Sequence, residues 1–248
     1  MSKSAVDRDA LLAQVAHRPW PMPAGPWVIE QCWQDVLFAH WPMTIESVRA
    51  SVPATLELDT FSDRAWVSAV AFRIDPFRPR GLPLELSFPE LNLRTYVRRD
   101  GQPGIYFFSL DAASRTAVLG GRILFRLHYY ESAMALVADS HFDFTSRRLV
   151  APRANFHARY RSTGDLLSVH RASLEEWLVE RYCLYAARAG GATFRVEVHH
   201  LPWLLQSAEA ELNADELFFA AQLPAPDSPP LLHFSARQDA LTWAPAPV

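Results

Sequence analysis

Hydrophobic and polar residues alternate along much of the chain, and a period of two is typical of β-strands that bury one face. These β-like runs are short, and turn-forming residues separate them. They cover residues 27–38, 64–74, 91–98, 105–110, 129–138, 141–149, 155–161, 192–200 and 231–243. Many short strands with few helices predict an α+β protein of mainly antiparallel strands. Its sheet should close, or nearly close, into a barrel with the helices outside it.

Prolines and glycines mark the breaks between these runs. The proline-rich segments 17–26, 76–83 and 224–230 are predicted to be loops or sheet edges, because proline lacks a backbone donor. Asp100-Gly101 and Gly104 stand between two of the runs. An Asp-Gly pair in such a place favours a tight turn, so we expect a β-hairpin here.

Three helices are predicted, over residues 44–50, 111–119 and 173–188. Thr44 and Asp111 are suitable N-caps for the first two, because each has a side-chain oxygen that accepts from the first turn. Ser173 and Glu176 have the spacing of a capping box at the start of the third. Gly190-Gly191 would end that helix, since glycine adopts the left-handed conformation of a helix C-terminus.

Two adjacent glycines, Gly120-Gly121, precede an apolar run that ends on His128-Tyr129-Tyr130. The glycines either end the preceding helix or lie inside it at a point of close backbone packing. We expect the helix to stop soon after them. Alternation from Ile123 onward then predicts a strand that carries the histidine and the tyrosines.

A polar stripe is predicted on the strand around residues 88–94. Glu90, Asn92 and Arg94 are two residues apart, so they point to the same face. If that face points into the barrel, Arg94 can bind the carboxylate of an organic acid and Glu90 can transfer a proton. If it points outward, the stripe is a solvated surface. The pattern leaves the two orientations open.

Composition and charge limit the partners. The chain has 248 residues, of which 50% are hydrophobic, and this is enough for a sizeable core. Its net charge of −3 predicts no nucleic-acid and no membrane partner. No run approaches the ~20 apolar residues of a membrane span. Asp7 and Asp9 stand where a signal peptide would need apolar residues, so a cytoplasmic location is expected. Self-association stays open.

Known cofactor motifs are missing from the sequence. There is no phosphate-binding glycine loop, no nucleophilic serine motif and no metalloprotease motif. Cys32 and Cys183 are far apart and are predicted to be buried free thiols. His199-His200 would point to opposite faces of a strand, so they cannot easily share a metal. We therefore expect no metal and no cofactor.

Several motifs, taken together, resemble one family. In chain order they are HRPWP (17–21), FAHWP (38–42), LELDTF (56–61), AWV (65–67), FPELNLRTYVRRDGQPGIYFFSLDAASR (88–115), ERYCLY (180–185) and HHLPWLLQ (199–206). They resemble the uncharacterised YqjF-like family of bacterial proteins over about residues 17–245. That family is grouped with the acetoacetate decarboxylase-like superfamily. The resemblance implies one domain over residues 1–248, with residues 1–16 as an N-terminal extension and a β-barrel that has a central cavity.

The resemblance also indicates where the site should lie. In acetoacetate decarboxylase, a Gly-Gly-Arg segment leads through an aromatic-rich run to a proline and two lysines. One lysine, with its pKa depressed, forms a Schiff base with the keto acid. Gly120-Gly121-Arg122 looks like that segment, and the proline and lysines would fall at about His128, Tyr129 and Tyr130. The strand glutamate of the family is matched more loosely by Glu90.

The lysines themselves are absent from that segment. Lys3 is the only lysine in the chain, beside 23 arginines. A phenol cannot form an imine, so acetoacetate decarboxylase activity is not expected, and a role for Lys3 is the least expected alternative because a chain terminus positions a nucleophile poorly.

The candidate pocket residues share polar or ionisable side chains: Glu90, Arg94, Arg122, His128, Tyr129 and Tyr130. One hypothesis is a small-molecule-binding barrel with lysine-independent chemistry on an organic acid or carbonyl compound. The other is a non-enzymatic ligand-binding or interaction protein on the same scaffold.

Overall fold

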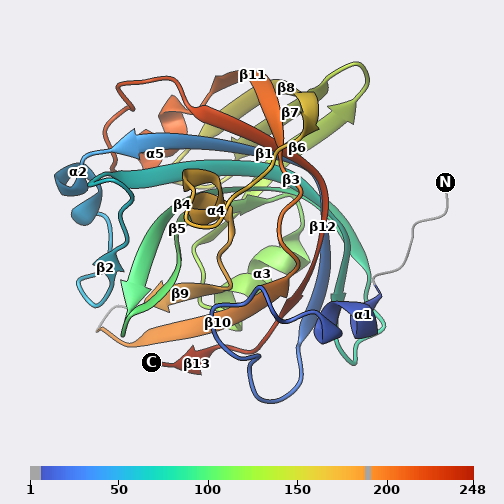
Figure 1. Ribbon diagram of the computed structural model, residues 1–248. Coiled ribbons are helices and arrows are strands. Elements are labelled where there is room, and N and C mark those ends of the chain that lie inside the picture. Colours follow the sequence, from blue (N-terminus) through green and yellow to red (C-terminus); the bar gives the residue numbers. More distant parts are fainter. Residues whose placement is uncertain (1–6, 188–190) are drawn as a thin grey trace.

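The computed structural model describes residues 7–187 and 191–248, and most of these residues are in strands or turns (Figure 1). Within these two ranges, five short helices accompany the strands. The helices are α1 (Arg8–Ala13), α2 (Ile45–Arg49), α3 (Arg115–Ile123), α4 (Leu174–Val179) and α5 (Asp215–Ala220). The strands are β1 (Ile29–Met43), β2 (Glu57–Leu58), β3 (Ala65–Pro79), β4 (Leu86–Arg99), β5 (Gln102–Ala112), β6 (Tyr129–Ala138), β7 (Phe142–Arg148), β8 (Asn155–Leu166), β9 (Cys183–Ala187), β10 (Thr193–His200), β11 (Gln206–Asn213), β12 (Leu231–Thr242) and β13 (Ala246–Pro247).

The sheet closes on itself. Strands β12, β1, β3, β4, β5, β9 and β10 are neighbours in that order, and β10 pairs again with β12. A second path from β5 to β12 runs through β6, β7, β8 and β11, in the upper part of Figure 1. Only the pairings of β5 with β6 and with β9 are parallel among the described strands. The predicted class, a mainly antiparallel sheet closed into a barrel, is therefore confirmed.

Strand β4 is buried on both faces, which settles the orientation that the sequence left open. Leu91 and Leu93 pack in a hydrophobic core between β4 and the strands of the second path, where Phe144 lies. The alternate residues Glu90 and Arg94 point into the first ring and line its cavity. Neither face of β4 is exposed to solvent, so the polar stripe is not a solvated surface. It faces the cavity of the first ring.

The predicted hairpin is present, with one change. Arg99 and Gln102 are the last paired residues of β4 and β5. Asp100 and Gly101 between them have φ angles of 51° and 76°, which is the left-handed geometry of a two-residue hairpin turn. Gly104 is not part of the turn. It lies in β5, where an added Cβ would stand 2.7 Å from the Sγ of Cys183.

The helix predicted over residues 173–188 is much shorter in the structure. Its start is right, because the Glu176 amide donates to the Ser173 hydroxyl at 3.3 Å. The helix α4 ends at Val179, and residues 183–187 form β9 instead. Backbone pairing with β10 and β5 outweighs the helical pattern there. Arg188 and Gly190, at the expected end of the helix, lie outside the described residues.

The helix around the glycines is shifted by a few residues. Asp111 belongs to β5, and Ser114 is the N-cap of α3 because its hydroxyl accepts from Ala117 at 3.3 Å. Helix α3 includes the glycines and ends at Ile123, soon after them, as expected. The strand predicted from Ile123 begins only at Tyr129. The capped helix α2 was predicted correctly, with the Ser47 amide donating to the Thr44 hydroxyl at 3.2 Å.

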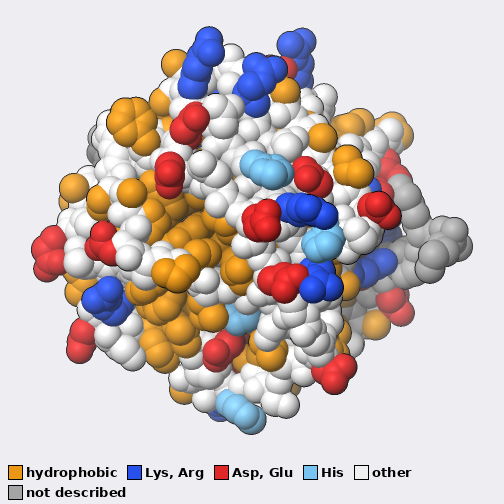
Figure 2. All heavy atoms as spheres, turned by 90° about the horizontal axis from the view of Figure 1, so that it is seen from above, with side chains coloured by type: hydrophobic (Ala, Val, Ile, Leu, Met, Phe, Trp, Pro, Cys, Tyr) orange, Lys and Arg blue, Asp and Glu red, His pale blue; other side chains and the backbone are white. Residues whose placement is uncertain are grey.

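The face at the top of Figure 1, where β7, β8 and β11 lie, is drawn in Figure 2. Arginine, carboxylate and histidine side chains are interspersed on it, and hydrophobic side chains gather on one side. This face therefore presents no field of a single sign. Among the described helices, none has the length and hydrophobicity of a membrane-crossing segment.

Candidate functional site

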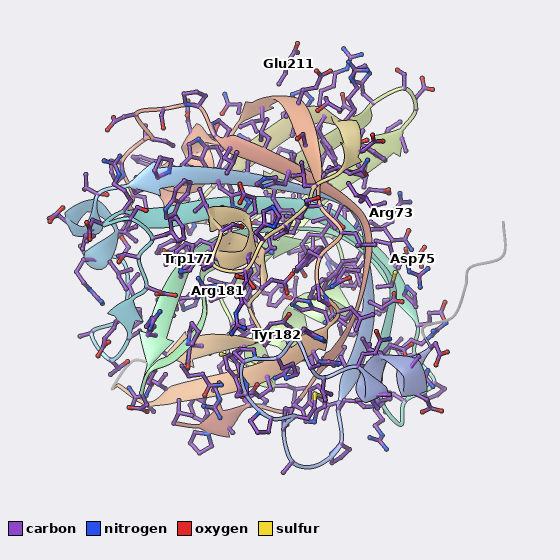
Figure 3. The ribbon with its side chains drawn as sticks, in the orientation of Figure 1. Arg73, Asp75, Trp177, Arg181, Tyr182 and Glu211 are labelled. Atoms are coloured by element: carbon purple, nitrogen blue, oxygen red, sulfur yellow. The ribbon has the colours of Figure 1, made fainter. Side chains whose placement is uncertain are left out.

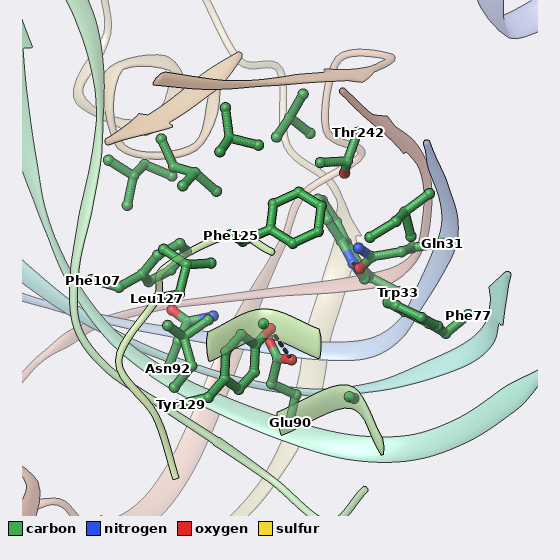
Figure 4. A pocket seen from close by; sticks show the side chains of 18 of the residues that line it. Gln31, Trp33, Phe77, Glu90, Asn92, Phe107, Phe125, Leu127, Tyr129 and Thr242 are labelled. Atoms are coloured by element: carbon green, nitrogen blue, oxygen red, sulfur yellow. Dashed lines mark hydrogen bonds between the residues drawn. The ribbon is translucent and has the colours of Figure 1, made fainter. Parts of the chain in front are cut away.

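The first ring of strands encloses a cavity of about 670 Å³. Its wall is mainly apolar, with side chains from β1, β3, β4, β5, β10 and α3, and Figure 4 shows it from close by. On β1 the lining changes from odd positions (Gln31, Trp33) to even ones (Val36, Phe38). A register shift between Gln34 and Leu37 explains this, because a bulge reverses the alternation of a strand.

The cavity has a closed end and an open end. Arg94 is paired in register with Ser68, and Ser68 with His40, so these residues lie at one level of the barrel. His40 and Ser68 are fully buried beneath the cavity and bond to each other at 2.7 Å. The opposite end is lined by exposed residues of the β3–β4 loop, the end of α3 and the segment after β12: Arg80, Leu82, Leu124 and Ala244.

A hydrogen-bonded pair, Glu90 and Tyr129, lies in the wall between these ends. The Tyr129 hydroxyl donates to the Glu90 carboxyl at 2.9 Å, the dashed line in Figure 4. Burial raises the pKa of Glu90 to about 8, although the tyrosine hydrogen bond opposes the rise. Burial and the neighbouring carboxyl also raise the pKa of Tyr129 well above its ordinary value. Glu90 therefore exchanges its proton near neutral pH while Tyr129 stays a hydrogen-bond donor.

The glycine pair makes room for this tyrosine. A Cβ added at Gly121 would stand 2.3 Å from the Tyr129 ring, which is far inside van der Waals contact. A Cβ added at Gly120 would meet nothing within 4 Å. Only Gly121 is therefore required by packing, because the backbone of α3 lies directly against the ring that holds Glu90.

Arg94 is the principal cation at the closed end. Its side chain is buried, and its Nη2 donates to the carbonyl of Leu178 at 3.3 Å. No carboxylate of the described chain forms an ion pair with it, and its Nε has no hydrogen-bond partner there. Buried arginines are normally paired with an acid. Arg94 is therefore available to an anion that enters the cavity.

A second arginine stands beside it. Arg181 also lines the cavity, and Figure 3 shows it next to Trp177 and helix α4. Its Nη1 donates to Asp59 at 2.6 Å, and its Nε donates to the Trp177 carbonyl at 2.8 Å. Its Nη2 has no partner in the described chain. Burial lowers the pKa of Arg181 and the adjacent Arg94 lowers it further, while Asp59 opposes this.

Four residues that line the cavity carry a buried polar atom without a partner in the described chain. Three atoms are donors, Arg94 Nε, Arg181 Nη2 and Trp203 Nε1, and one is an acceptor, Asn92 Oδ1. Buried polar groups are nearly always hydrogen-bonded, so such a set needs an explanation. Three donors, two of them on guanidinium groups, suit an anionic oxygen group such as a carboxylate.

The six residues singled out in the sequence are divided by the structure. Glu90, Arg94 and Tyr129 line the cavity, and the other three do not. His128 and Tyr130 flank Tyr129 in sequence, so alternation turns them away from the cavity. His128 is exposed, and the Tyr130 ring lies 3.9 Å from the Arg148 guanidinium.

Arg122, the third of these, is exposed at the end of α3. Its Nε donates to the backbone carbonyl of Tyr129 at 2.7 Å, so it holds the start of β6 from outside. Its contact with the site is therefore indirect, through the backbone of Tyr129.

Sequence reasoning missed His200, Arg181 and Trp203 as cavity residues. Adjacent histidines on a strand do point to opposite faces, and here both are buried. The His200 ring lines the cavity, and burial lowers its pKa to about 4, so it is neutral at pH 7. The described residues contain no group of three or more histidine, cysteine or acidic side chains placed to hold a metal.

The closed ring and its cavity define the class: this is a protein with the acetoacetate decarboxylase fold. Acetoacetate decarboxylase from Legionella pneumophila superposes with a TM-score of 0.64 at 13% identity, covering 100% of this chain and 98% of that one. The enduracididine biosynthesis enzyme MppR complexed with pyruvate gives 0.58 at 13%, with 91% of each chain covered. At such identities the likeness concerns the fold alone.

Sequence comparison supplies the family. The chain belongs to the DUF2071 family, described as an uncharacterized conserved protein, whose model matches residues 30–239. It is 45% identical over 226 residues to the uncharacterized protein YqjF of Bacillus subtilis (strain 168), covering 90% of this chain and 93% of that one. The described residues contain no lysine, since Lys3 lies outside them.

Proposed function

We propose that this protein binds a small organic acid in the cavity of the first ring and transfers a proton on it without a lysine. The Arg94 guanidinium binds the carboxylate, and the Glu90–Tyr129 pair acts on a carbonyl group of the same molecule. The observation that carries the proposal is Arg94 itself, a buried cation that lines the cavity and has no acidic partner in the described chain.

The chemistry follows from the protonation states of the pair. In its carboxylate form, Glu90 removes a proton from the carbon next to the carbonyl, and the electrons of that C–H bond move to the carbonyl oxygen. As Glu90 takes up this proton, the single hydrogen of the Tyr129 hydroxyl turns from the Glu90 carboxyl and is donated to the developing enolate oxygen. Return of the proton to the same carbon completes an exchange that needs no cofactor. A pKa of about 8 keeps both forms of Glu90 populated near neutral pH.

A structural neighbour supports the ligand class. MppR, which shares the fold, is described as complexed with pyruvate, a small keto acid. Schiff-base chemistry is not part of our proposal, because Lys3 is the only lysine of the chain.

We also propose that the chain acts as one domain, since β5 and β12 each belong to both paths of the sheet, with residues 1–16 as an extension. A cytoplasmic location stays a prediction.

Binding is tested by titration calorimetry with 2-, 4- and 5-oxohexanoate and with the matched neutral amides. Arg94→Gln should weaken binding of the acids by about tenfold to hundredfold, because it removes charge-assisted hydrogen bonds. Binding of the amides should change little. Arg153→Gln, which removes an exposed arginine outside the cavity, is the control and should bind the acids as the wild type does. Equal affinities for acids and amides would refute the role of Arg94.

Proton transfer is tested by deuterium exchange next to the carbonyl, followed by proton NMR in D₂O. The wild type should catalyse the exchange of at least one of these isomers, and Glu90→Gln should abolish it while retaining binding. Binding without exchange would refute the catalytic half and favour a non-enzymatic binding protein. Borohydride treatment with the same acids should leave Lys3 unlabelled, because an imine is not formed.

A further inference from the structure

We infer that the ligand is a monocarboxylic acid with a long apolar tail, bound with its carboxylate at the closed end of the cavity and its tail toward the mouth. This rests on the proposed function for the carboxylate and goes beyond it in the size and polarity of the rest of the molecule. Three independent features carry it: the cavity volume, the order of side chains along its depth, and the exposed leucines at its mouth.

The volume excludes a good fit to the smallest keto acids. Cavities of roughly 300–1,000 Å³ enclose drug-sized ligands, and this cavity has about 670 Å³. A three-carbon acid such as pyruvate would leave most of that space empty. An empty apolar space loses the contacts that close packing supplies. A larger molecule is therefore the better occupant.

The buried charged groups of the cavity lie at its closed end and in its middle. Arg94 is at the level of the buried residues Ser68 and His40, at the closed end. Glu90 is four residues nearer the mouth, about 13 Å along the strand. Beyond it the wall is mainly apolar, with side chains such as Phe77, Leu82 and Leu124. Its polar members there are Gln31, Thr242 and the exposed Arg80. A ligand that matches this order has its charge at the bottom and hydrocarbon above.

The mouth exposes apolar surface. Leu82, in the loop between β3 and β4, and Leu124, after α3, line the cavity with 61% and 64% of their surfaces exposed. Helix α3 also exposes Leu119 and Ile123. A tail that reaches the mouth covers the first two leucines and removes part of this surface from water.

One cation at the mouth favours the opposite orientation. Arg80 lines the outer cavity, is exposed, and lies 5.0 Å from the Trp27 ring. A carboxylate there would stay in contact with water and gain little, because exposed ion pairs are weak. Arg94 is buried and unpaired with any acid of the described chain, so a carboxylate gains more at the closed end.

The test is titration calorimetry with straight-chain carboxylates from butanoate to decanoate and with the primary alcohols of equal length. Affinity should rise about fourfold per added methylene until the tail reaches the mouth. Each acid should bind about tenfold or more tightly than its alcohol. Arg94→Gln should abolish the preference for the acid and keep the dependence on length, whereas Arg80→Gln should change neither.

The mouth is tested separately. Leu82→Asp should weaken the longest acids and leave butanoate unchanged, because only a long tail reaches the loop. Leu166→Asp places the same change at a similarly exposed leucine, 57% exposed, that does not line the cavity, and it should have no effect.

The outcomes separate this inference from the proposed function. If affinity depends on Arg94 but does not change with the chain length of the acid, the inference of a long apolar tail is wrong and the proposed function still stands. Affinity that rises with length equally for acids and alcohols, unchanged by Arg94→Gln, would overturn the proposed function instead. Loss of the acid preference in Arg80→Gln would overturn the orientation.

Discussion

Replacing Glu90 by glutamine should make the protein more stable at alkaline pH. Glu90 is buried, with 5% of its surface exposed, and its pKa rises from an ordinary value near 4.5 to about 8. The folded state therefore holds this proton more tightly than the unfolded state does. The stability that this gives is fully present below pH 4.5 and is lost progressively as the pH rises to about 8. Glutamine has no proton to lose and avoids this cost.

The size of this gain in stability follows from the rise in the pKa of Glu90. The rise from 4.5 to about 8 is about 3.5 units, and each unit corresponds to about 1.36 kcal/mol. The difference in free energy of unfolding between Glu90→Gln and the wild type should thus grow by about 4–5 kcal/mol, as an upper bound, between pH 4.5 and pH 8. Above pH 8.5 it should stay constant. Tyr129 can still donate to the glutamine oxygen, so the geometry of the pair is kept.

The assay is urea unfolding of both proteins at half-unit steps from pH 4.5 to pH 9.5. Glu211→Gln, the same chemical change at an exposed position visible at the top of Figure 3, is the control and should give a constant difference from the wild type. Comparison with the wild type at each pH cancels the titration of all other groups. A constant difference for Glu90→Gln as well would refute the assignment of a raised pKa to this carboxyl.

Further predictions concern the same wall of the cavity. Tyr129→Phe should cost about 1–3 kcal/mol in urea unfolding, and it should move the titration of Glu90 to higher pH because the hydrogen bond that lowers its pKa is lost. Gly121→Ala should destabilise the protein and weaken ligand binding through its clash with the ring, whereas Gly120→Ala should be neutral or stabilise by up to ~1 kcal/mol. Arg94→Met should raise the free energy of unfolding by about 1–3 kcal/mol without ligand, since it removes a buried cation that lacks an acidic partner in the described chain, while binding of acids is lost.

Much of the fold follows from local pattern. Strands such as β4 and β6 are predicted by alternation, and Asp100-Gly101 predicts the tight turn between β4 and β5. Strand β9 does not, because residues 183–187 continue the helical spacing that starts at Ser173. Their strand conformation comes from pairing with β5 and β10, which are distant in sequence. The local sequence pattern of residues 183–187 does not predict this pairing with distant strands.

The candidate site, like the fold, could be predicted from the sequence only in part. Spacing on one strand was enough to group Glu90 with Arg94, and the resemblance drew attention to Tyr129. Sequence did not show which face of β4 points inward, because both faces are buried. It also did not show that Arg181 and His200 come to the same cavity, since they reach it only through closure of the ring by β9 and β10.

The most direct test of the account is a crystal structure of the protein with 5-oxohexanoate bound. We predict that its carboxylate contacts Arg94 Nε and Arg181 Nη2 at the closed end, with the keto group on the side of Glu90 and Tyr129. A carboxylate bound at Arg80 in the mouth, or a ligand bound outside the cavity, would contradict the account.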